Sequence, residues 1–261
     1  MAAGFSVNTR STPPDEQTAP FPTVAVIIVN YRKGKRLLEG LESIRKQSVA
    51  SSLSTVIVDN SVCDSEASLL HAEIRPSERL VINTTNDGYS KACNAAVRAA
   101  GASDYVFLLN PDIILDNRRT IELLVRAMEA DSSIGVLGCL QRNDDGSYVE
   151  SARFYPYLWK QVIRRLISGS YTDEQLLEPL LRTPPADYVD VDWLQSSVMF
   201  VRGPIWNAVG GLDETYYVFM ADVDFCRHAH ALGSRVVITS RATVRADGLR
   251  ASAGGLFEVF R

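Results

Sequence analysis

The feature that most constrains the fold is a continuous, mainly β-branched run near the start of the chain, Thr23-Val-Ala-Val-Ile-Ile-Val-Asn30. A continuous run of β-branched residues is typical of a strand that is buried on both faces, as in a parallel sheet. Leu37, Leu38, Leu41 and Ile44 then recur at helical spacing. The run therefore predicts the first strand and helix of an α/β fold.

Segments typical of strands and helices continue to alternate through the first 140 residues. Further strands are predicted at 54–59, 80–83, 104–110 and 135–140, and helices at 90–100, with Ser90 as the N-cap, and at 120–130. This alternation predicts a single Rossmann-like, mostly parallel sheet flanked by helices on both faces. Ligands of such sheets gather at the carboxyl ends of strands, where Asn30, Asp59 and Asn110–Asp112 stand.

The alternation stops near residue 144, where Asp144–Ser147 predicts a hairpin turn. Later helices are predicted at 158–167, 173–182, 204–209 and 223–232, a strand within 189–201, and a last strand at 236–238. We divide the chain into a flexible leader at 1–22, a first half at 23–142, and a second half of the same domain at 143–261.

Composition excludes several classes of protein. Hydrophobic residues make up 46% of the chain, enough for a sizeable core, and the net charge is −4 with no Lys/Arg block, which argues against a nucleic-acid partner. The four cysteines form no CxxC pair, as expected for reduced thiols in the cytoplasm. The apolar runs stay short of the roughly 18 residues that cross a bilayer.

Carboxylates recur at two places where they could act on a ligand. Asp222 and Asp224 stand two positions apart beside the predicted helix at 223–232, and Asp112 closes the strand-end sequence Asn110-Pro111-Asp112. Carboxylates serve as general bases and as ligands of hard cations. Cys226, His228 and His230 form a less convincing cluster, because His228 points away from the other two on a helix. We expect Cys226 in the core and both histidines at the surface.

Several motifs carry a resemblance when they are taken in order. They are Val29-Asn30-Tyr31, Val58–Ser61, Asn86–Tyr89 with Asn94, Asn110–Asp112, Asp145–Ser147 with Ser151-Ala152-Arg153, Val191–Leu194, and Gly210–Glu214 leading to Asp222–Asp224. Together they resemble the family 2 glycosyltransferases of the nucleotide-diphospho-sugar (GT-A) fold, and most of all the bacterial rhamnosyltransferases. The resemblance covers about residues 24 to 252, and it implies a GT-A-type sheet with a smaller acceptor-side subregion.

The resemblance implies a nucleotide-sugar site on the first half of the chain. Asp59 would read the base, because a carboxylate accepts hydrogen bonds from a pyrimidine N–H. The residues implied at this site are Asn30, Tyr31, Asp59, Asn86, Gly88, Asn94, Asn110, Asp112 and Arg245. Structural alternatives stay open: Asp59 could cap a turn, Asn30 could end a strand, and Gly88 could be a plain turn glycine.

The resemblance also implies a metal ion. Asp112 would ligate Mg²⁺ or Mn²⁺, which neutralises charge on the departing nucleoside diphosphate. Asn110 offers only a neutral carbonyl oxygen. Arg245 stands where the family often has a histidine ligand, and a guanidinium cannot ligate a metal but can bind phosphate. We therefore expect weaker metal dependence, with Arg245 sharing the diphosphate charge.

Catalysis and acceptor binding are implied in the second half. Asp222 would be the general base of an inverting transfer, and Asp224 would orient Arg227 or nearby backbone. Ala221 replaces the usual glutamate before Asp222, and a purely structural role at the helix N-terminus stays open for Asp222. The residues implied on the acceptor side are Asp192, Trp193, Asp224 and Arg153, with a core role as the alternative for Trp193.

These expectations combine into a function. The chain would transfer rhamnose from dTDP-rhamnose to a saccharide or lipid-linked acceptor in bacterial surface polysaccharide (lipopolysaccharide) synthesis. A UDP-hexose donor and a catalytically weak sugar-nucleotide or glycan-binding protein stay open. A nucleotidyltransferase is disfavoured, because Tyr31–Gly34 is no glycine-rich loop. We expect a cytoplasmic protein, with peripheral contact to the inner face of the plasma membrane (through 158–167 or 255–260) and a homodimer as further options.

Overall fold

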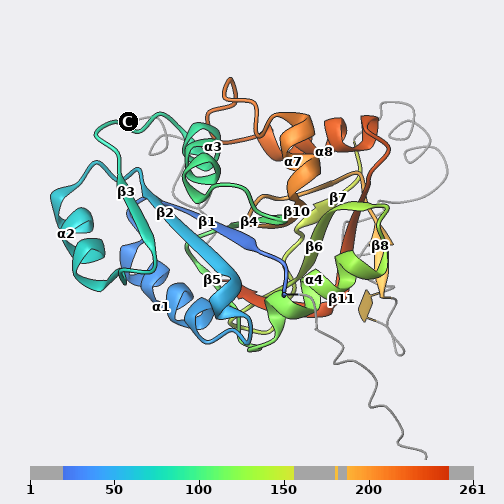
Figure 1. Ribbon diagram of the computed structural model, residues 1–261, viewed down its shortest axis with the longest axis horizontal. Coiled ribbons are helices and arrows are strands. Elements are labelled where there is room, and N and C mark those ends of the chain that lie inside the picture. Colours follow the sequence, from blue (N-terminus) through green and yellow to red (C-terminus); the bar gives the residue numbers. More distant parts are fainter. Residues whose placement is uncertain (1–19, 156–179, 182–186, 247–261) are drawn as a thin grey trace, which may run out of the picture.

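The computed structural model describes residues 20–155, 180–181 and 187–246. A nine-stranded sheet forms the centre of this part of the chain (Figure 1). Its strands are β1 (Val24–Asn30), β2 (Leu53–Asp59), β3 (Arg79–Ile82), β4 (Tyr105–Leu109), β5 (Ile113–Ile114), β6 (Ile134–Asn143), β8 (Tyr188–Asp190), β10 (Val198–Arg202) and β11 (Arg235–Ala246). A two-stranded sheet pairs β7 (Ala152–Arg153) with β9 (Trp193–Leu194).

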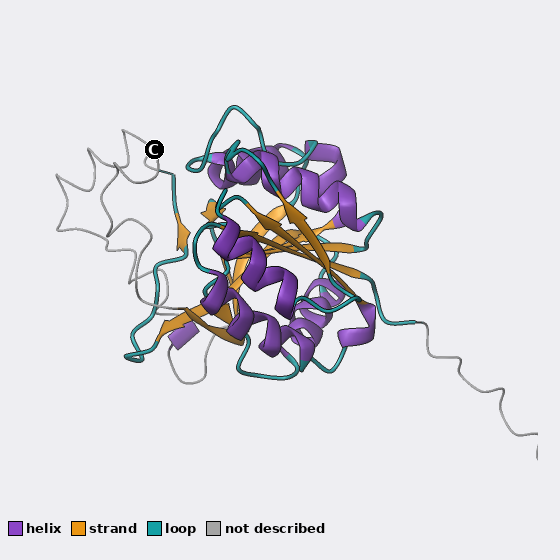
Figure 2. Ribbon diagram, turned by 90° about the vertical axis from the view of Figure 1, so that its left-hand side faces the viewer, coloured by secondary structure: helices purple, strands orange, loops and turns teal. Residues whose placement is uncertain are grey.

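Helices cover both faces of the sheet, as the two perpendicular views show (Figures 1 and 2). They are α1 (Gly34–Arg45), the 3-10 helix η1 (Ala50–Ser52), α2 (Asp64–Glu73), α3 (Tyr89–Ala100), α4 (Thr120–Ala130), α7 (Gly203–Val209) and α8 (Ala221–Ala231). Alternate residues of β1 belong to different hydrophobic cores. Val24, Val26 and Ile28 pack with α1 and α4, whereas Ala25, Ile27 and Val29 pack with α3, α7 and α8. A strand with helices on both faces must be apolar throughout, which explains the continuous apolar sequence of β1.

The strand order is β3-β2-β1-β4-β10-β6-β11-β5, and β8 pairs with β11. β1 runs parallel to β2 and β4, and β11 runs parallel to β6, whereas β10 is antiparallel to both of its neighbours. More paired positions are parallel than antiparallel, so the predicted α/β class with a mostly parallel sheet is confirmed. Strands from both predicted halves share this sheet.

Several local predictions are confirmed and others are wrong. The turn near Gly146 is present, since its φ is +85° and the Asn143 amide donates to the Ser147 carbonyl at 2.8 Å. Ser90 does not cap α3: Gly88 holds the N-cap position, and the Ser90 hydroxyl donates to the Tyr216 carbonyl at 2.7 Å. The helix predicted at 223–232 begins two residues earlier, which places the first carboxylate of the cluster in its first turn.

The last strand is much longer than the predicted segment at 236–238. β11 continues to Ala246, with a register shift against β6 between Thr239 and Thr243. The residues around this bulge are mostly polar, so a prediction based on apolar runs ended the strand too early. Most of the predicted leader, nearly all of the helices predicted at 158–167 and 173–182, and the tail at 255–260 lie outside the described residues.

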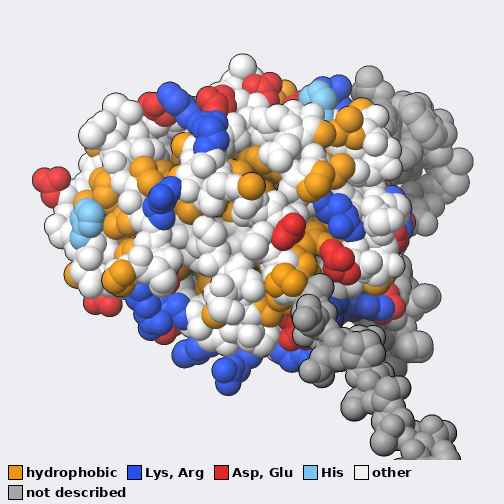
Figure 3. Space-filling model, viewed as in Figure 1, with side chains coloured by type: hydrophobic (Ala, Val, Ile, Leu, Met, Phe, Trp, Pro, Cys, Tyr) orange, Lys and Arg blue, Asp and Glu red, His pale blue; other side chains and the backbone are white. Residues whose placement is uncertain are grey.

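The surface gives little indication of a partner. On the face shown in Figure 3, acidic and basic side chains are interspersed among exposed hydrophobic ones. Within residues 20–155, 180–181 and 187–246, every helix is too short or too polar to cross a bilayer.

The aromatic cluster beneath α4 yields a stability prediction. Phe200 is fully buried, with its ring centroid 5.0 Å from that of Tyr105 and 5.3 Å from that of Phe107. Phe200→Ala should lower the free energy of unfolding by about 3–5 kcal/mol, because it leaves a cavity between β4 and β6. Urea denaturation measures the loss. Phe219→Ala is the matched control, since Phe219 is 59% exposed and should change stability by less than about 0.5 kcal/mol. Equal losses in the two variants would contradict the packing described.

Candidate active site

Strand ends converge at one edge of the sheet. Asn30 and Asp59 are register partners at the carboxyl ends of β1 and β2. The amino end of the antiparallel β10 meets the carboxyl end of β4, where the Asn110 amide donates to the Ser197 carbonyl at 2.9 Å. The neighbouring Ser196 amide donates to Asp222 Oδ2 at 3.1 Å. Asp59 and Asp222, which are more than 160 positions apart in the sequence, therefore lie at the same edge of the sheet.

Asp59 is fully buried at this edge and is only half satisfied. Its Oδ1 accepts from Asn30 Nδ2 at 2.9 Å and from the Ser61 amide at 3.1 Å. Its Oδ2 has no hydrogen-bond partner among the described residues. Most buried polar atoms are paired in folded proteins, and an unpaired acceptor at a strand end fits an incoming N–H donor.

Asn30 holds the two neighbouring loops together. Its Nδ2 donates to Asp59, to Ser61 Oγ at 3.2 Å and to Glu66 Oε2 at 3.0 Å, while its Oδ1 accepts from the Lys33 amide at 3.1 Å. Because both polar atoms of the Asn30 side chain have partners within the protein, Asn30 acts on a ligand only through the groups that it positions. Tyr31, the next residue, is half-buried at the same edge.

Backbone strain is concentrated around the site. Among the described residues, the non-glycine positions with left-handed φ are Arg32 at 55°, Val62 at 48° and Met220 at 76°. They follow β1, follow β2 and precede α8, respectively. A β-branched residue such as Val62 rarely adopts this conformation, and such outliers cluster at functional sites. The strain is therefore an independent indication that this edge is functional.

Asn86 and Gly88 contact the loop that leads to α8. The Tyr217 hydroxyl donates to the Asn86 carbonyl at 2.9 Å, and the Tyr89 amide donates to the Tyr217 carbonyl at 2.7 Å. Gly88 has φ of +98°, and a Cβ there would lie 2.6 Å from the Tyr217 carbonyl oxygen. Glycine is thus required both by conformation and by the close approach of the loop.

Asn94 fixes the same loop one turn further along α3. Its Oδ1 accepts from the Leu212 amide at 2.9 Å, and its Nδ2 donates to the Leu212 carbonyl at 2.7 Å and to Glu214 Oε1 at 3.0 Å. The predicted contact with a ribose or diphosphate remains untested. What the side chain does in the structure is to anchor the glycine-rich loop that positions Asp222.

Asp222 lies half-buried in the first turn of α8. Its Oδ2 accepts from the Ser196 amide and its Oδ1 from the Val223 amide at 2.9 Å. Burial raises the pKa of this carboxyl and outweighs the backbone N–H donors, which lower it. A carboxylate with a raised pKa is a stronger base, so the arrangement suits proton abstraction at the sheet edge.

Asp224 has a different environment from Asp222. It accepts from Arg227 Nη2 at 3.0 Å, as predicted, and lies 3.2 Å from His228 Nδ1. Cys226 is buried and His228 and His230 are exposed, which confirms the placement expected from helical spacing.

The predicted acceptor residues lie beside α8. Arg153 and Trp193 are paired across β7 and β9, and the Arg153 Cζ lies 5.8 Å from the Trp193 ring centroid. Asp192 Oδ2 accepts from the Tyr155 amide at 2.6 Å, and its carbonyl lies 3.1 Å from Nε2 of His230 on α8. Trp193 is half-buried, between the exposed and core alternatives. Their part in acceptor binding stays a prediction.

Asp112, the predicted metal ligand, forms an ion pair with Lys33. Asp112 Oδ2 lies 2.7 Å from Lys33 Nζ. Arg245 lies elsewhere and forms two bonds to Asp116, at 3.1 and 3.2 Å, and one to Asp144 at 3.2 Å. Among the described residues, no three His, Cys, Asp or Glu side chains gather as a metal site. This donor set does not fit a resident divalent ion, and we derive no catalytic step from one.

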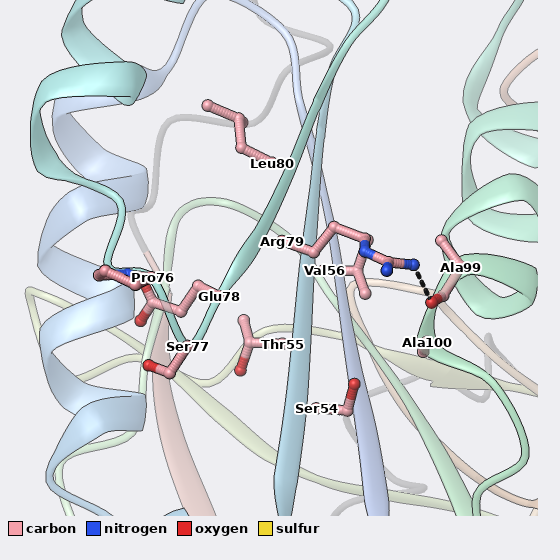
Figure 4. Close-up of a pocket in the computed structure, with 10 residues that line it drawn as sticks. All are labelled: Ser54, Thr55, Val56, Pro76, Ser77, Glu78, Arg79, Leu80, Ala99 and Ala100. Carbon is pink, nitrogen blue, oxygen red and sulfur yellow. Dashed lines mark hydrogen bonds between the residues drawn. The ribbon is translucent and has the colours of Figure 1, made fainter.

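A cavity of about 520 Å³ lies away from these groups (Figure 4). It opens between the amino ends of β2 and β3 and the carboxyl end of α3, where Arg79 donates to the Ala99 carbonyl. Its one carboxylate, Glu78, is paired with Arg45 at 2.6 Å. The opposite edge of the sheet holds the unpaired acceptor and the carboxyl with the raised pKa, so we place the site there.

Sequence reasoning did not single out every residue of this site. Lys33, Glu66, Ser196 and Tyr217 make contacts that no motif indicated. A basic residue directly after the first strand was a weak signal for Lys33. Ser196 acts through its backbone amide, which a sequence pattern cannot reveal.

Known proteins resemble this chain in sequence. The family described as "Glycosyltransferase like family 2" matches residues 22–257. Over 218 residues the chain is 29% identical to the N-acetylglucosaminyl-diphospho-decaprenol L-rhamnosyltransferase of Mycobacterium tuberculosis, covering 76% of this chain and 67% of the relative. It is 27% identical over 137 residues to the rhamnosyltransferase WbbL of Escherichia coli, covering 51% of this chain and 48% of WbbL.

A solved structure supports the fold. The mannosyltransferase PcManGT from Pyrobaculum calidifontis, in complex with GDP-Man and Mn²⁺, superposes with a TM-score of 0.63 at 19% identity. The superposition covers 89% of this chain and 59% of the mannosyltransferase. At this identity the likeness establishes the GT-A-like fold, and the chain spans less than two thirds of that protein.

The environment of Asp222 yields a prediction for its ionisation. Burial disfavours the charged form, so the carboxyl ¹³C resonance of Asp222 should titrate above the roughly 3.9 of an exposed aspartate. NMR spectra of the wild type and of Asp222→Asn identify the resonance by difference. Asp145 is an internal control, because hydrogen bonds from Ser147 hold its pKa below the ordinary value. An Asp222 midpoint at or below that of Asp145 would contradict the buried placement.

Proposed function

The chain belongs to glycosyltransferase family 2, and from this premise we propose that it is an inverting enzyme that transfers L-rhamnose from dTDP-rhamnose. The acceptor is a saccharide or a lipid-linked saccharide of bacterial surface polysaccharide synthesis. The names of the two rhamnosyltransferase relatives support the choice of sugar.

One observation carries the proposal: Asp222 and the half-satisfied Asp59 belong to the same edge of the sheet. The first has a pKa raised by burial, and the second has a buried oxygen without a hydrogen-bond partner among the described residues. A transferase needs a group that recognises the donor and a base for the acceptor. The two carboxylates supply these two parts.

Donor recognition is the role we give to Asp59. A thymine ring carries one N–H, at N3, and this donor would pair with Asp59 Oδ2. The Oδ1 atom cannot take this part, because Asn30 and Ser61 already donate to it. Tyr31 lies beside the same strand end and is half-buried, so its ring is available to a base.

Proton transfer is the role we give to Asp222. Its carboxylate takes the proton of the acceptor hydroxyl as that oxygen attacks the anomeric carbon. The bond from the anomeric carbon to the diphosphate oxygen breaks on the opposite side, the electron pair leaves with the nucleoside diphosphate, and the configuration inverts. The Ser196 and Val223 amides orient the carboxylate for this step.

The two alternatives, a UDP-hexose donor and a catalytically weak binding protein, concern the same residues. Uracil carries the same N3–H, so a UDP-hexose donor would use Asp59 in the same way. The alternative of a catalytically weak binding protein rests on Ala221 in place of a glutamate and on Arg245 in place of a histidine. Ala221 is 1% exposed and packs in the core with α7, so its methyl group fills a buried position near the site. The loss of a carboxylate there leaves Asp222 in place.

Asp222→Asn should reduce transfer from dTDP-rhamnose by roughly 10²–10⁴-fold, because the amide cannot accept the proton. Product formation with a synthetic lipid-diphosphate acceptor measures the loss. Binding of dTDP should change by less than about threefold. Asp64→Asn is the matched control, because it makes the same change at an exposed position in the first turn of α2, and it should retain most of the activity. Full activity of Asp222→Asn would remove this residue from the mechanism.

Base recognition is tested without any mutation. N3-methyl-dTDP lacks the N–H that would meet Asp59 Oδ2, and we expect it to bind about tenfold or more weakly than dTDP. Isothermal titration calorimetry compares the two ligands on the wild-type protein. Equal affinities would show that the base is read elsewhere.

A further inference from the structure

We propose that Lys33 is the cation that holds the donor diphosphate in this protein, acting from a fixed position on Asp112. The inference rests on the proposed function, since it names the group that binds part of the same donor. It differs from the expectation drawn from the sequence, which gave the diphosphate to a metal on Asp112 and to Arg245.

The side chain of Lys33 is held by Asp112. Its Nζ lies 2.7 Å from Asp112 Oδ2, and the lysine side chain is 32% exposed whereas that of Asp112 is 12% exposed. The ion pair crosses from the loop after β1 to the turn after β4. A partly buried pair of this kind is screened less by solvent than a surface pair. Asp112 thus anchors an ammonium group that remains accessible at the edge.

The backbone of Lys33 is equally constrained. Its amide donates to Asn30 Oδ1 at 3.1 Å, and its carbonyl accepts from the Leu37 amide at 2.9 Å, in the first turn of α1. Arg32, directly before it, adopts the left-handed φ of 55°. A strained residue directly before an anchored one indicates that the direction of this loop is specified.

The chemistry of the ammonium group suits a diphosphate. Lysine has three N–H donors, and Asp112 accepts one of them. The donors that remain can bind two diphosphate oxygens. When the bond to the sugar breaks, negative charge grows on the diphosphate, and a fixed cation stabilises that charge without a proton transfer.

Arg245, which the sequence suggested as a diphosphate ligand, is less suited to this part. Arg245 donates from three of its nitrogen atoms to Asp116 and Asp144. A divalent ion on Asp112 would share this one carboxylate with the Lys33 ammonium, and the two cations would repel each other at that distance. The geometry favours Lys33 on Asp112 over a metal on Asp112.

Calorimetry with dTDP tests the proposal on the full chain. Wild-type affinity should differ by less than about threefold between EDTA and excess Mn²⁺. Lys33→Met should weaken binding in EDTA by about tenfold or more, and Mn²⁺ should restore part of the loss because Asp112 is then available. Lys35→Met, which removes the same charge from an exposed position in the same helical turn, should bind as the wild type does.

A second variant, Asp112→Asn, keeps the proposal testable if Lys33→Met fails to fold. Asp112→Asn keeps the lysine but removes the carboxylate that fixes it, so it should weaken dTDP binding in EDTA by less than Lys33→Met does. If Asp112 were a metal ligand, this variant would instead lose Mn²⁺-dependent binding. Wild-type binding that collapses in EDTA, or a Lys33→Met variant that binds as the wild type does, would overturn the role of Lys33.

Binding of Mn²⁺ alone gives a readout that is independent of the nucleotide. Electron paramagnetic resonance should detect tighter Mn²⁺ binding by Lys33→Met than by the wild type, and equal binding would count against the ion pair. The two proposals also fail differently. A wild type that binds neither dTDP nor UDP in EDTA or Mn²⁺ would overturn the proposed function and this inference together, whereas metal-dependent binding would overturn the inference alone.

Discussion

The hydrogen bond from Asn30 Nδ2 to Asp59 Oδ1 is the contact on which the site depends. It joins the carboxyl ends of β1 and β2 at a position where both side chains are fully buried. A buried carboxylate needs donors, and Asn30 and Ser61 satisfy one of its oxygens. The same amide of Asn30 also reaches Glu66, so two loops are tied to one point. The other carboxylate oxygen has no hydrogen-bond partner among the described residues.

The second half of the site is organised by a loop rather than by a strand. Asn94 fixes this loop at Leu212, Tyr217 fixes it beside Gly88, and Met220 turns it into α8 through a left-handed backbone. Asp222 follows in the first turn and meets the Ser196 amide. Burial raises the pKa of Asp222. Gly88 and Asn94, which were predicted to lie at the donor site, contact the loop before Asp222 and so contribute to that burial.

The sequence predicted the site more closely at strand ends than between side chains. Asp59 and Asp112 follow apolar runs, and parallel strands bring such positions to one edge, so their neighbourhood could be foreseen. The partner of Asp112 could not. Lys33 is 79 positions away, and only the turn after β1 brings its ammonium group to that carboxylate. Arg245 was assigned by analogy of position, yet the long β11 carries it to Asp116 and Asp144.

By itself the sequence determined the α/β class, the order of the first strands and helices, and the carboxylates available for chemistry. Apolar periodicity is a local property, and a strand covered by helices on both faces must be apolar along its whole length. The tertiary structure alone decided which charges meet, which oxygen of Asp59 stays unpaired and how deeply Asp222 is buried. These are properties of distances between residues far apart in the chain, and electrostatic interactions and desolvation depend on such distances rather than on residue order.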